Sequence, residues 1–301
     1  MPSTMLLQCE NSAALYEPTI TFQDTNVIGN VYFLSYFRWQ VECRDRWLQA
    51  NQPDVYDCVR SGKLPLWVAH WETHFSDPIG ATVGDQLRIS MELSQAGCNY
   101  LASTAIERVD PMGVSLIGAG KMDFAISKSL PLVSQHTHPN EHPAGPYFEF
   151  SLRLPRIVES DPVELVAWQG KCRELFLAEH APKSLAAVAH RQLAWQTTSA
   201  SLDIYKHVTE LDSVRIEMRL VALKCGQMSV RFDYYSVNVC EEFRFATGFQ
   251  TMSSKRYQST GIVPCPLPSD ILSALRKFTD SKAILEKIQS IQDFSSQGDS
   301  G

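Results

Sequence analysis

The sequence predicts an α+β fold of two similar units, each an antiparallel sheet wrapped around one long helix. Residues 39–44 read Trp-Gln-x-x-Cys-Arg, and the same pattern returns at 168–173, 129 positions later. A second stretch, 85–93, is echoed at 212–220 with an offset of 127, and two echoes at nearly one offset indicate a duplicated unit. The helix expected over 30–50 is apolar on almost every side, so a curved sheet must bury most of it.

The first unit, residues 1–130, is expected to contain a strand, a glycine loop, the long helix and three or four further strands. Alternating apolar and polar residues favour the first strand over 16–22, and Pro53 lies just after the helix. Turn residues separate the later strands. These strands are expected over 66–76, 85–94, 100–109 and 113–127.

The second unit, residues 147–262, is expected to repeat this order after a Pro/His-rich linker over 131–146. Pro162 suits the first turn of a helix running from 162 to 179. The strands that follow are expected over 193–207, 212–224, 228–237 and 242–254. Residues 263–301 are expected to form one or two amphipathic helices and a disordered end.

Polar and glycine residues gather between the first strand and the first long helix. They are Asp24, Thr25, Asn26, Gly29 and Asn30. A helix start offers amide donors and a positive dipole end, which suit an acyl carbonyl oxygen that gains charge. The matching stretch of the second unit, 156–162, has no glycine, so its backbone lacks the easiest route to a tight turn. We therefore expect one working site per chain, in or beside the first unit.

Composition narrows the class of protein. The 301 residues carry 27 basic and 33 acidic side chains, a net charge of −6, which argues against a nucleic-acid surface. The start of the chain has no basic segment followed by an apolar one, and no window reaches the roughly 18 apolar residues of a membrane span. We expect a soluble, cytoplasmic protein with no nucleic-acid partner and no membrane span.

Neither the cysteines nor the histidines predict a metal site. The eight cysteines form no Cys-x-x-Cys pair, and Cys43 and Cys172 occupy the repeated helix, where a small apolar thiol suits a core. Because Arg44 and Arg173 are adjacent to these cysteines, a role for Cys43 or Cys172 as a thiol nucleophile stays an alternative. An HxHxxEH cluster at 136–142 lacks the spacing of a structural zinc site and lies in the linker. We expect no metal and no cofactor.

The loop and helix residues resemble the hotdog-fold acyl thioesterases of the 4-hydroxybenzoyl-CoA thioesterase type. The likeness is greatest to the subgroup that releases polyenes from enediyne polyketide synthases, in which Asn replaces the catalytic Asp of the wider family. This chain has Asn26 there, then Gly-Asn-Val-Tyr at 29–32 and Cys-Arg at 43–44. The resemblance implies a double hotdog whose two units form an intramolecular pseudo-dimer. It also implies an acyl thioester hydrolase of specialised metabolism, with no GxSxG elbow in the sequence.

The resemblance also implies the substrate and the site. The substrate would be a polyketide or fatty acyl chain on an acyl carrier protein or coenzyme A, and a homodimer of double hotdogs is compatible with it. Asn26 and Arg44 are carried over as catalytic residues that position substrate or water and stabilise charge, because neither side chain can act as a general base. The backbone amides expected to bind the oxyanion are those of Gly29, Asn30 and Val31. The residues expected to contact the substrate are Tyr32, Tyr36 and Arg173.

Other interpretations of these residues stay open. Asn26 could only cap the helix, Arg44 could only neutralise Asp24 or Glu42, and the two tyrosines could be core residues. Either of these carboxylates could instead be the general base. The sequence does not decide whether Arg44 or Arg173 faces Asn26.

Two other functions also stay open. A double-hotdog dehydratase or cyclase would need a His paired with a carboxylate, and the loop before the first helix has no His. His74 or His207 could supply it if the fold brought either to the pocket. A hotdog that only binds acyl chains is the other alternative.

Overall fold

The structure is a computed structural model that describes residues 13–25, 31–75, 81–128, 145–153, 161–206, 208, 213–237, 242–259 and 261–298, with only the backbone given for 293–298. The expected linker falls almost entirely outside these residues, as do the HxHxxEH cluster and His207. The glycine-free stretch lies outside them as far as residue 160. No helix in the described ranges is long and apolar enough to cross a membrane.

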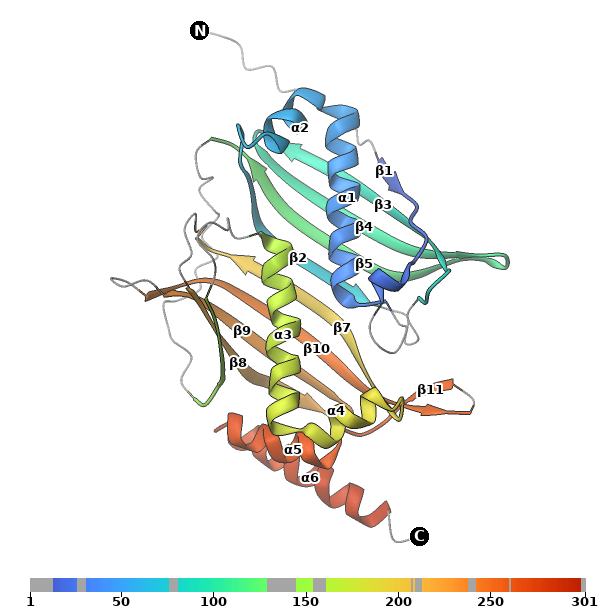
Figure 1. Ribbon diagram of the computed structural model, residues 1–301, viewed down its shortest axis with the longest axis vertical. Helices are drawn as coiled ribbons and strands as arrows, with labels where there is room; N and C mark the ends of the chain where they lie inside the picture. Colours follow the sequence, from blue (N-terminus) through green and yellow to red (C-terminus); the bar gives the residue numbers. More distant parts are fainter. Residues whose placement is uncertain are drawn as a thin grey trace.

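Within the described residues, eleven strands form a single antiparallel sheet that runs through both units (Figure 1). The strands of the first unit are β1 (Ala13–Tyr16), β2 (Leu66–Phe75), β3 (Gln86–Ala96), β4 (Asn99–Asp110) and β5 (Gly113–Ile126). Those of the second are β6 (Phe148–Arg153), β7 (Leu193–Ile204), β8 (Ser213–Lys224), β9 (Gln227–Val237), β10 (Glu242–Gln258) and β11 (Gly261–Pro264). The order β1-β3-β4-β5-β2-β7-β10-β9-β8-β6 joins the two units through β2 and β7, and β11 pairs with β10.

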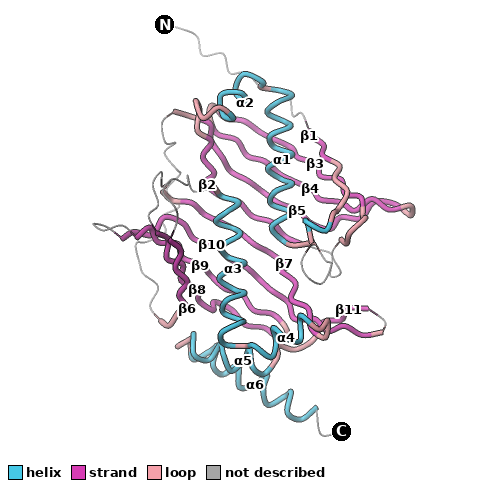
Figure 2. The backbone as a smooth tube through the Cα atoms, in the orientation of Figure 1, coloured by secondary structure: helices cyan, strands magenta, loops and turns pink. Residues whose placement is uncertain are grey.

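Six helices pack on or beside this sheet in the described part of the chain. They are α1 (Phe33–Asn51), α2 (Pro53–Arg60), α3 (Pro162–His180), α4 (Pro182–Ala189), α5 (Ser269–Leu275) and α6 (Lys282–Gly298). Short 3₁₀ turns lie at Phe22–Asp24 and Arg276–Phe278. α1 crosses the sheet of the first unit and α3 that of the second; they run in opposite directions and begin near the middle of the molecule (Figures 1 and 2). Both helices are largely buried, as predicted for the first from its apolar surface and for the second from the repeated fold.

The duplication extends from the helices to the sheet. Gln40 of α1 packs against Gly120 of β5, where an added Cβ would lie 2.4 Å from the glutamine Oε1. Gln169 of α3 packs in the same way against Gly248 of β10, where an added Cβ would lie 2.1 Å from Nε2. Each glycine therefore gives the helix glutamine room to reach the sheet, and the two pairs repeat the helix–sheet contact in both units.

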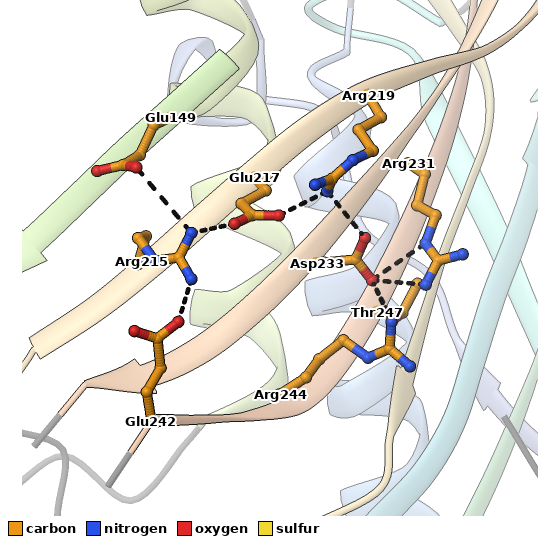
Figure 3. Close-up of polar contacts among 9 residues, drawn as sticks. All are labelled: Glu149, Arg215, Glu217, Arg219, Arg231, Asp233, Glu242, Arg244 and Thr247. Atoms are coloured by element: carbon orange, nitrogen blue, oxygen red, sulfur yellow. Dashed lines mark hydrogen bonds and ion pairs between the residues drawn. The ribbon is translucent and has the colours of Figure 1, made fainter. Parts of the chain in front are cut away.

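Charged residues form a network on the sheet face that points away from α3 (Figure 3). Tyr234 donates a hydrogen bond to the Leu165 carbonyl of α3, so the adjacent Asp233 points to the opposite face. Asp233 is fully buried and accepts two hydrogen bonds from Arg231, at 2.7 and 3.0 Å. Glu217 is its direct cross-strand partner, and like charges in such a pair repel unless cations compensate them. The neighbouring arginines therefore hold this face together.

Several expected element boundaries differ from the structure. The strand expected over 16–22 is wrong: β1 ends at Tyr16, and the chain reaches a 3₁₀ turn at Phe22. Pro18 explains the break, because it has no N–H for a sheet ladder, although its carbonyl accepts from the Leu87 amide. The short helices α2 and α4 were not expected. Each starts with a proline immediately after a long helix, where proline tolerates a first turn. α6 continues to Gly298, and the expected disordered end stays a prediction.

Candidate functional site

The start of α1 is anchored by backbone hydrogen bonds. Thr25 and Val31 form an antiparallel bridge, so these residues flank the loop 26–30, which lies outside the described residues together with the predicted Asn26, Gly29 and Asn30. The Val31 amide donates to the Ala81 carbonyl at 3.0 Å. The prediction that this amide binds an oxyanion is therefore wrong, because its hydrogen is already used inside the protein.

Two other backbone amides at the start of α1 can still donate a hydrogen bond to an oxyanion. The Tyr32 amide is also used, since it donates to the Asp24 carbonyl at 2.8 Å. Phe33 and Leu34 follow, and the N–H groups of a first helical turn have no partner within the helix. Among the described residues, no acceptor is found for either of these two amides. They are the donors that this helix start can offer to a developing negative charge.

Tyr32 lies at the contact between the two long helices. Its hydroxyl oxygen packs on Gly170 of α3, where an added Cβ would be only 2.2 Å away. Its ring contacts that of Phe33 edge to face, with centroids 4.7 Å apart. Burial raises the pKa of Tyr32, and the nearby charge of Arg173 opposes this shift. The first turn of α1 is thus built against the helix of the other unit.

Tyr36 has a different environment. It is buried, and its ring packs edge to face on Trp39 and Phe75 at centroid distances of 5.3 and 4.7 Å. These contacts match the core interpretation of this residue. A contact of Tyr36 with substrate stays a prediction.

Arg173 is the arginine that the fold brings to the start of α1. Its guanidinium carbon lies 5.5 Å from the centroid of the Phe33 ring. Its Nη1 donates to Thr197 Oγ1 at 3.0 Å and to Gln250 Oε1 at 3.2 Å. Gln250 in turn donates to Gln169 Oε1 at 3.1 Å. This buried network fixes the guanidinium beside the helix start, where a fixed positive charge can act on a bound carbonyl.

Arg44 occupies the matching position in the first unit but has other partners. Eleven residues separate it from Phe33, which places it roughly 16 Å along α1 from the helix start. Two of its nitrogens donate to Asp45 Oδ1, at 2.7 and 2.9 Å. Its Nη1 meets the sulfur of Met122 at 3.9 Å, whereas Arg173 has Gln250 at the equivalent place on the sheet. The catalytic role predicted for Arg44 is not decided by these contacts.

The two carboxylates proposed as general bases are engaged in local contacts. Asp24 Oδ2 accepts from the Thr21 amide at 2.9 Å and from the Thr21 hydroxyl at 2.7 Å, which closes a capping box. Glu42 pairs with Arg46 on the exposed side of α1, at 2.9 Å. A carboxylate that the sequence analysis did not single out is Glu174. It lies 3.9 Å from Arg173, is half-exposed, and raises the pKa of Tyr32 electrostatically.

The histidines of β2 lie on the other face of the sheet. Trp71 and Thr73 both hydrogen-bond the Gln40 side chain of α1, at 3.1 and 2.7 Å. Because side chains alternate along a strand, His70 and His74 point away from the helices. His74 therefore cannot supply the proton-transfer group of the dehydratase alternative at the start of α1. Within the described ranges, no cluster of His, Cys, Asp and Glu could hold a metal ion.

His70 instead joins the two units at their common seam. It is the cross-strand partner of Asp203 between β2 and β7. The His70 Nδ1 lies 2.6 Å from Asp203 Oδ1. This hydrogen bond raises the pKa of His70 above its usual value, in opposition to the effect of partial burial.

Comparisons with known proteins were made by sequence and by structure. No protein-family model and no curated protein matches the chain by sequence. A putative oleoyl thioesterase from Lactobacillus plantarum superposes with a TM-score of 0.58 at 10% identity, over 86% of this chain and 97% of that one. The 12:0-ACP thioesterase from Umbellularia californica superposes with a TM-score of 0.57 at 10% identity, over 81% and 94%.

The chain has the double-hotdog fold. The predicted α+β architecture, with two units in one polypeptide, is confirmed by these superpositions, which include most of both chains. A crystal structure of the Dynemicin thioesterase, from a study of polyene binding, matches 44% of this chain and 96% of its own, at 29% identity and a TM-score of 0.41. The double hotdog places the start of α1 beside α3, so the candidate site lies between the units.

Proposed function

We propose that this protein hydrolyses an acyl thioester at the junction of its two hotdog units. The observation that carries the proposal is the position of Arg173, which reaches from α3 to the first turn of α1. The similarity of the fold to that of acyl-ACP thioesterases supports the reaction class. The residues of the first unit that resemble the enediyne subgroup support a polyketide or fatty acyl chain, carried by an acyl carrier protein or coenzyme A.

The proposed reaction is addition of water to the thioester carbonyl. The water oxygen bonds to the carbonyl carbon, the oxygen of the carbonyl gains negative charge, and the C–S bond then breaks to release the carrier thiol. The amides of Phe33 and Leu34 and the guanidinium of Arg173 stabilise that charge. Asn26 orients the carbonyl or the water in this proposal. Arg173 has the charge-stabilising role that the sequence predicted for Arg44, because Arg173 contacts the start of α1.

The incoming water must lose a proton, and the thiolate must gain one. Asn and Arg cannot accept a proton at neutral pH. Glu174 can, because it is a half-exposed carboxylate next to Arg173 and close enough to Tyr32 to shift its pKa. We assign it as the general base, a role that typically contributes about 10²–10⁴ in rate in enzymes.

Mass spectrometry of acyl-thioester cleavage tests the proposal. A panel of acyl carrier protein and coenzyme A thioesters is incubated with the wild-type protein and with the Asn26→Ala, Arg173→Gln and Glu174→Gln variants. We expect free acid from the wild type and a loss of about 10²–10³ in rate when an oxyanion-stabilising group is removed. Equal rates for wild type and Asn26→Ala would remove that residue from the site. Acyl binding without turnover by the wild type would identify a non-catalytic hotdog instead.

A further inference from the structure

A pocket lies at the end of the second unit, among elements that Figure 1 shows far from α1. It has a volume of about 670 Å³ and is formed by α4, α5 and the adjoining strands β7 and β10. Volumes in this range suit small ligands. His180 of α3 lines the pocket, and its ring lies 4.9 Å from that of Phe278. It follows Arg173 by seven residues, which is roughly 10 Å along the helix. The pocket is therefore separate from the thioesterase site.

The walls of the pocket are joined by hydrogen bonds. Asp270 at the start of α5 accepts from the Ser184 hydroxyl of α4 at 2.6 Å and from the Ser184 amide at 2.9 Å. It also accepts from the Ile271 amide at 3.0 Å. These bonds hold α5 against α4 at the edge of the pocket. They also satisfy the only carboxylate among the residues that line it.

Three cations from three elements line the same pocket. They are Lys183 of α4, Arg256 of β10 and Lys277 of the turn after α5. None of them has an ion-pair partner among the described residues, although the chain as a whole carries a net charge of −6. With Asp270 counted and His180 neutral, the lining has a net charge of +2. Such a concentration of unpaired positive charge in an acidic protein favours an anionic ligand.

We propose that this pocket binds the phosphate group of a small phosphorylated molecule. A phosphate monoester carries nearly two negative charges at neutral pH, which matches the net charge of the lining, whereas a carboxylate would neutralise only half of it. Lysine and arginine both donate charge-assisted hydrogen bonds to phosphate oxygens. The hydroxyl of Ser269 also lines the pocket and can donate to the same group, whereas that of Ser273 donates to the Ser269 carbonyl at 2.8 Å.

The C-terminal segment is what creates this site. α4 of the second unit corresponds to α2 of the first, since both are eight-residue helices that follow the long helix. Among the described residues of the first unit, no element corresponds to α5, which supplies one wall of the pocket. The site is thus an addition to the duplicated fold, and the proposal does not depend on hydrolysis at α1.

Binding of matched ligands to the full chain tests the inference. Isothermal titration calorimetry at low ionic strength compares AMP with adenosine, which differ only in the phosphate. Coenzyme A compared with dephospho-coenzyme A then distinguishes a free phosphorylated metabolite from the nucleotide end of a thioester carrier. We expect AMP to bind and adenosine to bind at least about tenfold more weakly, with the difference reduced by added salt. A preference for coenzyme A over dephospho-coenzyme A would identify the carrier as the source of the phosphate.

Substitutions of the three cations test whether AMP binds in this pocket. Lys183→Gln combined with Lys277→Gln should weaken AMP binding at least about tenfold, and Arg256→Gln should also weaken it. Lys282→Gln is the matched control, because this lysine is 91% exposed and pairs with Glu286 outside the pocket. Thermal unfolding of each variant verifies that it folds. The inference is overturned if the wild type binds AMP no better than adenosine, or if Lys282→Gln weakens AMP binding as much as the pocket variants do. It is also overturned if an acidic peptide binds the pocket and AMP does not.

Discussion

The guanidinium of Arg173 and the ring of Phe33 meet across the boundary between the two units, 5.5 Å apart. One residue belongs to the middle of α3 and the other is the first residue of α1. Their contact means that neither unit contains the complete site. The duplicated chain contains two copies of the Trp-Gln-x-x-Cys-Arg helix. In the fold, the arginine of the second copy, Arg173, lies beside the start of α1.

This relationship predicts that the two equivalent arginines differ in function. Arg173→Gln should lower the rate of acyl-thioester hydrolysis by about 10²–10³, because it removes a fixed cation from the site. Arg44→Gln should lower it by less than about tenfold, since Arg44 contacts Asp45 and Met122 roughly 16 Å along α1. Single-turnover rates at saturating substrate measure both effects. A larger loss in Arg44→Gln would return the catalytic role to that residue.

Gly170 offers a test of the junction itself. Alanine in a helix interior normally stabilises by about 1 kcal/mol relative to glycine. At this position its Cβ would lie 2.2 Å from the Tyr32 hydroxyl and 3.3 Å from Phe33 Cε1. We therefore expect Gly170→Ala to destabilise the protein by about 1–3 kcal/mol.

Urea unfolding of a double-mutant cycle checks this expectation. Tyr32→Phe removes the clashing oxygen, so the double variant should recover part of the loss, with a coupling energy of about 0.5–3 kcal/mol. Gly248→Ala is a useful comparison, because its Cβ would meet Gln169 within the second unit instead of the junction. Strict additivity of Gly170→Ala and Tyr32→Phe would show that the helices separate at this point.

The sequence was sufficient for the fold because the helix and its sheet partners repeat together. The apolar surface of 30–50 predicted a buried helix, and α1 and α3 are buried as expected. It was insufficient at the first strand, where Pro18 interrupts the alternating pattern. The use of the Val31 amide could not be foreseen either, because its acceptor, Ala81, is fixed only by tertiary structure.

The choice between the two arginines shows why the site was harder to predict than the fold. The motifs around Arg44 and Arg173 share the pattern Trp-Gln-x-x-Cys-Arg, so this pattern cannot rank the two arginines. Their difference arises 77 or 78 residues away, where Gln250 accepts from one and Met122 meets the other. An amide oxygen can hold a guanidinium in place and a thioether only weakly. Comparison of the two units strand by strand could have revealed this signal.

The His70–Asp203 pair predicts how stability depends on pH. The folded-state pKa of His70 is raised above the usual 6.5 by its hydrogen bond to Asp203. A raised pKa means that the pair stabilises the protein fully below about pH 6.5, and that this stabilisation is lost as pH rises through the folded-state pKa of His70. The groups that face His70 are Asp203 of β7, Glu72 of β2 and Asp123 of β5, all of which favour its charged form.

Urea unfolding of Asp203→Asn at several pH values measures this dependence. The variant should lose stability relative to wild type at pH 5.5–6.5, and the difference should shrink as pH rises through the folded-state pKa of His70. His74→Gln is the control, since this residue lies on the same strand and face with 65% of its side chain exposed. A constant difference between Asp203→Asn and wild type from pH 5.5 to 9 would remove the titration of His70 as the cause.

The two cysteines of the repeated motif predict the outcome of thiol labelling. Burial raises the pKa of the Cys43 and Cys172 thiols to about 12, so at pH 8 only about one in 10⁴ molecules carries the reactive thiolate at either position. Iodoacetamide should label the exposed Cys98 and Cys225, leave these two unmodified, and leave thioester hydrolysis intact. Peptide mass spectrometry reads the label, and labelling in urea shows that the buried thiols react once exposed. Inactivation that follows modification of Cys43 or Cys172 in the folded protein would instead establish a thiol nucleophile, and the water mechanism would have to be abandoned.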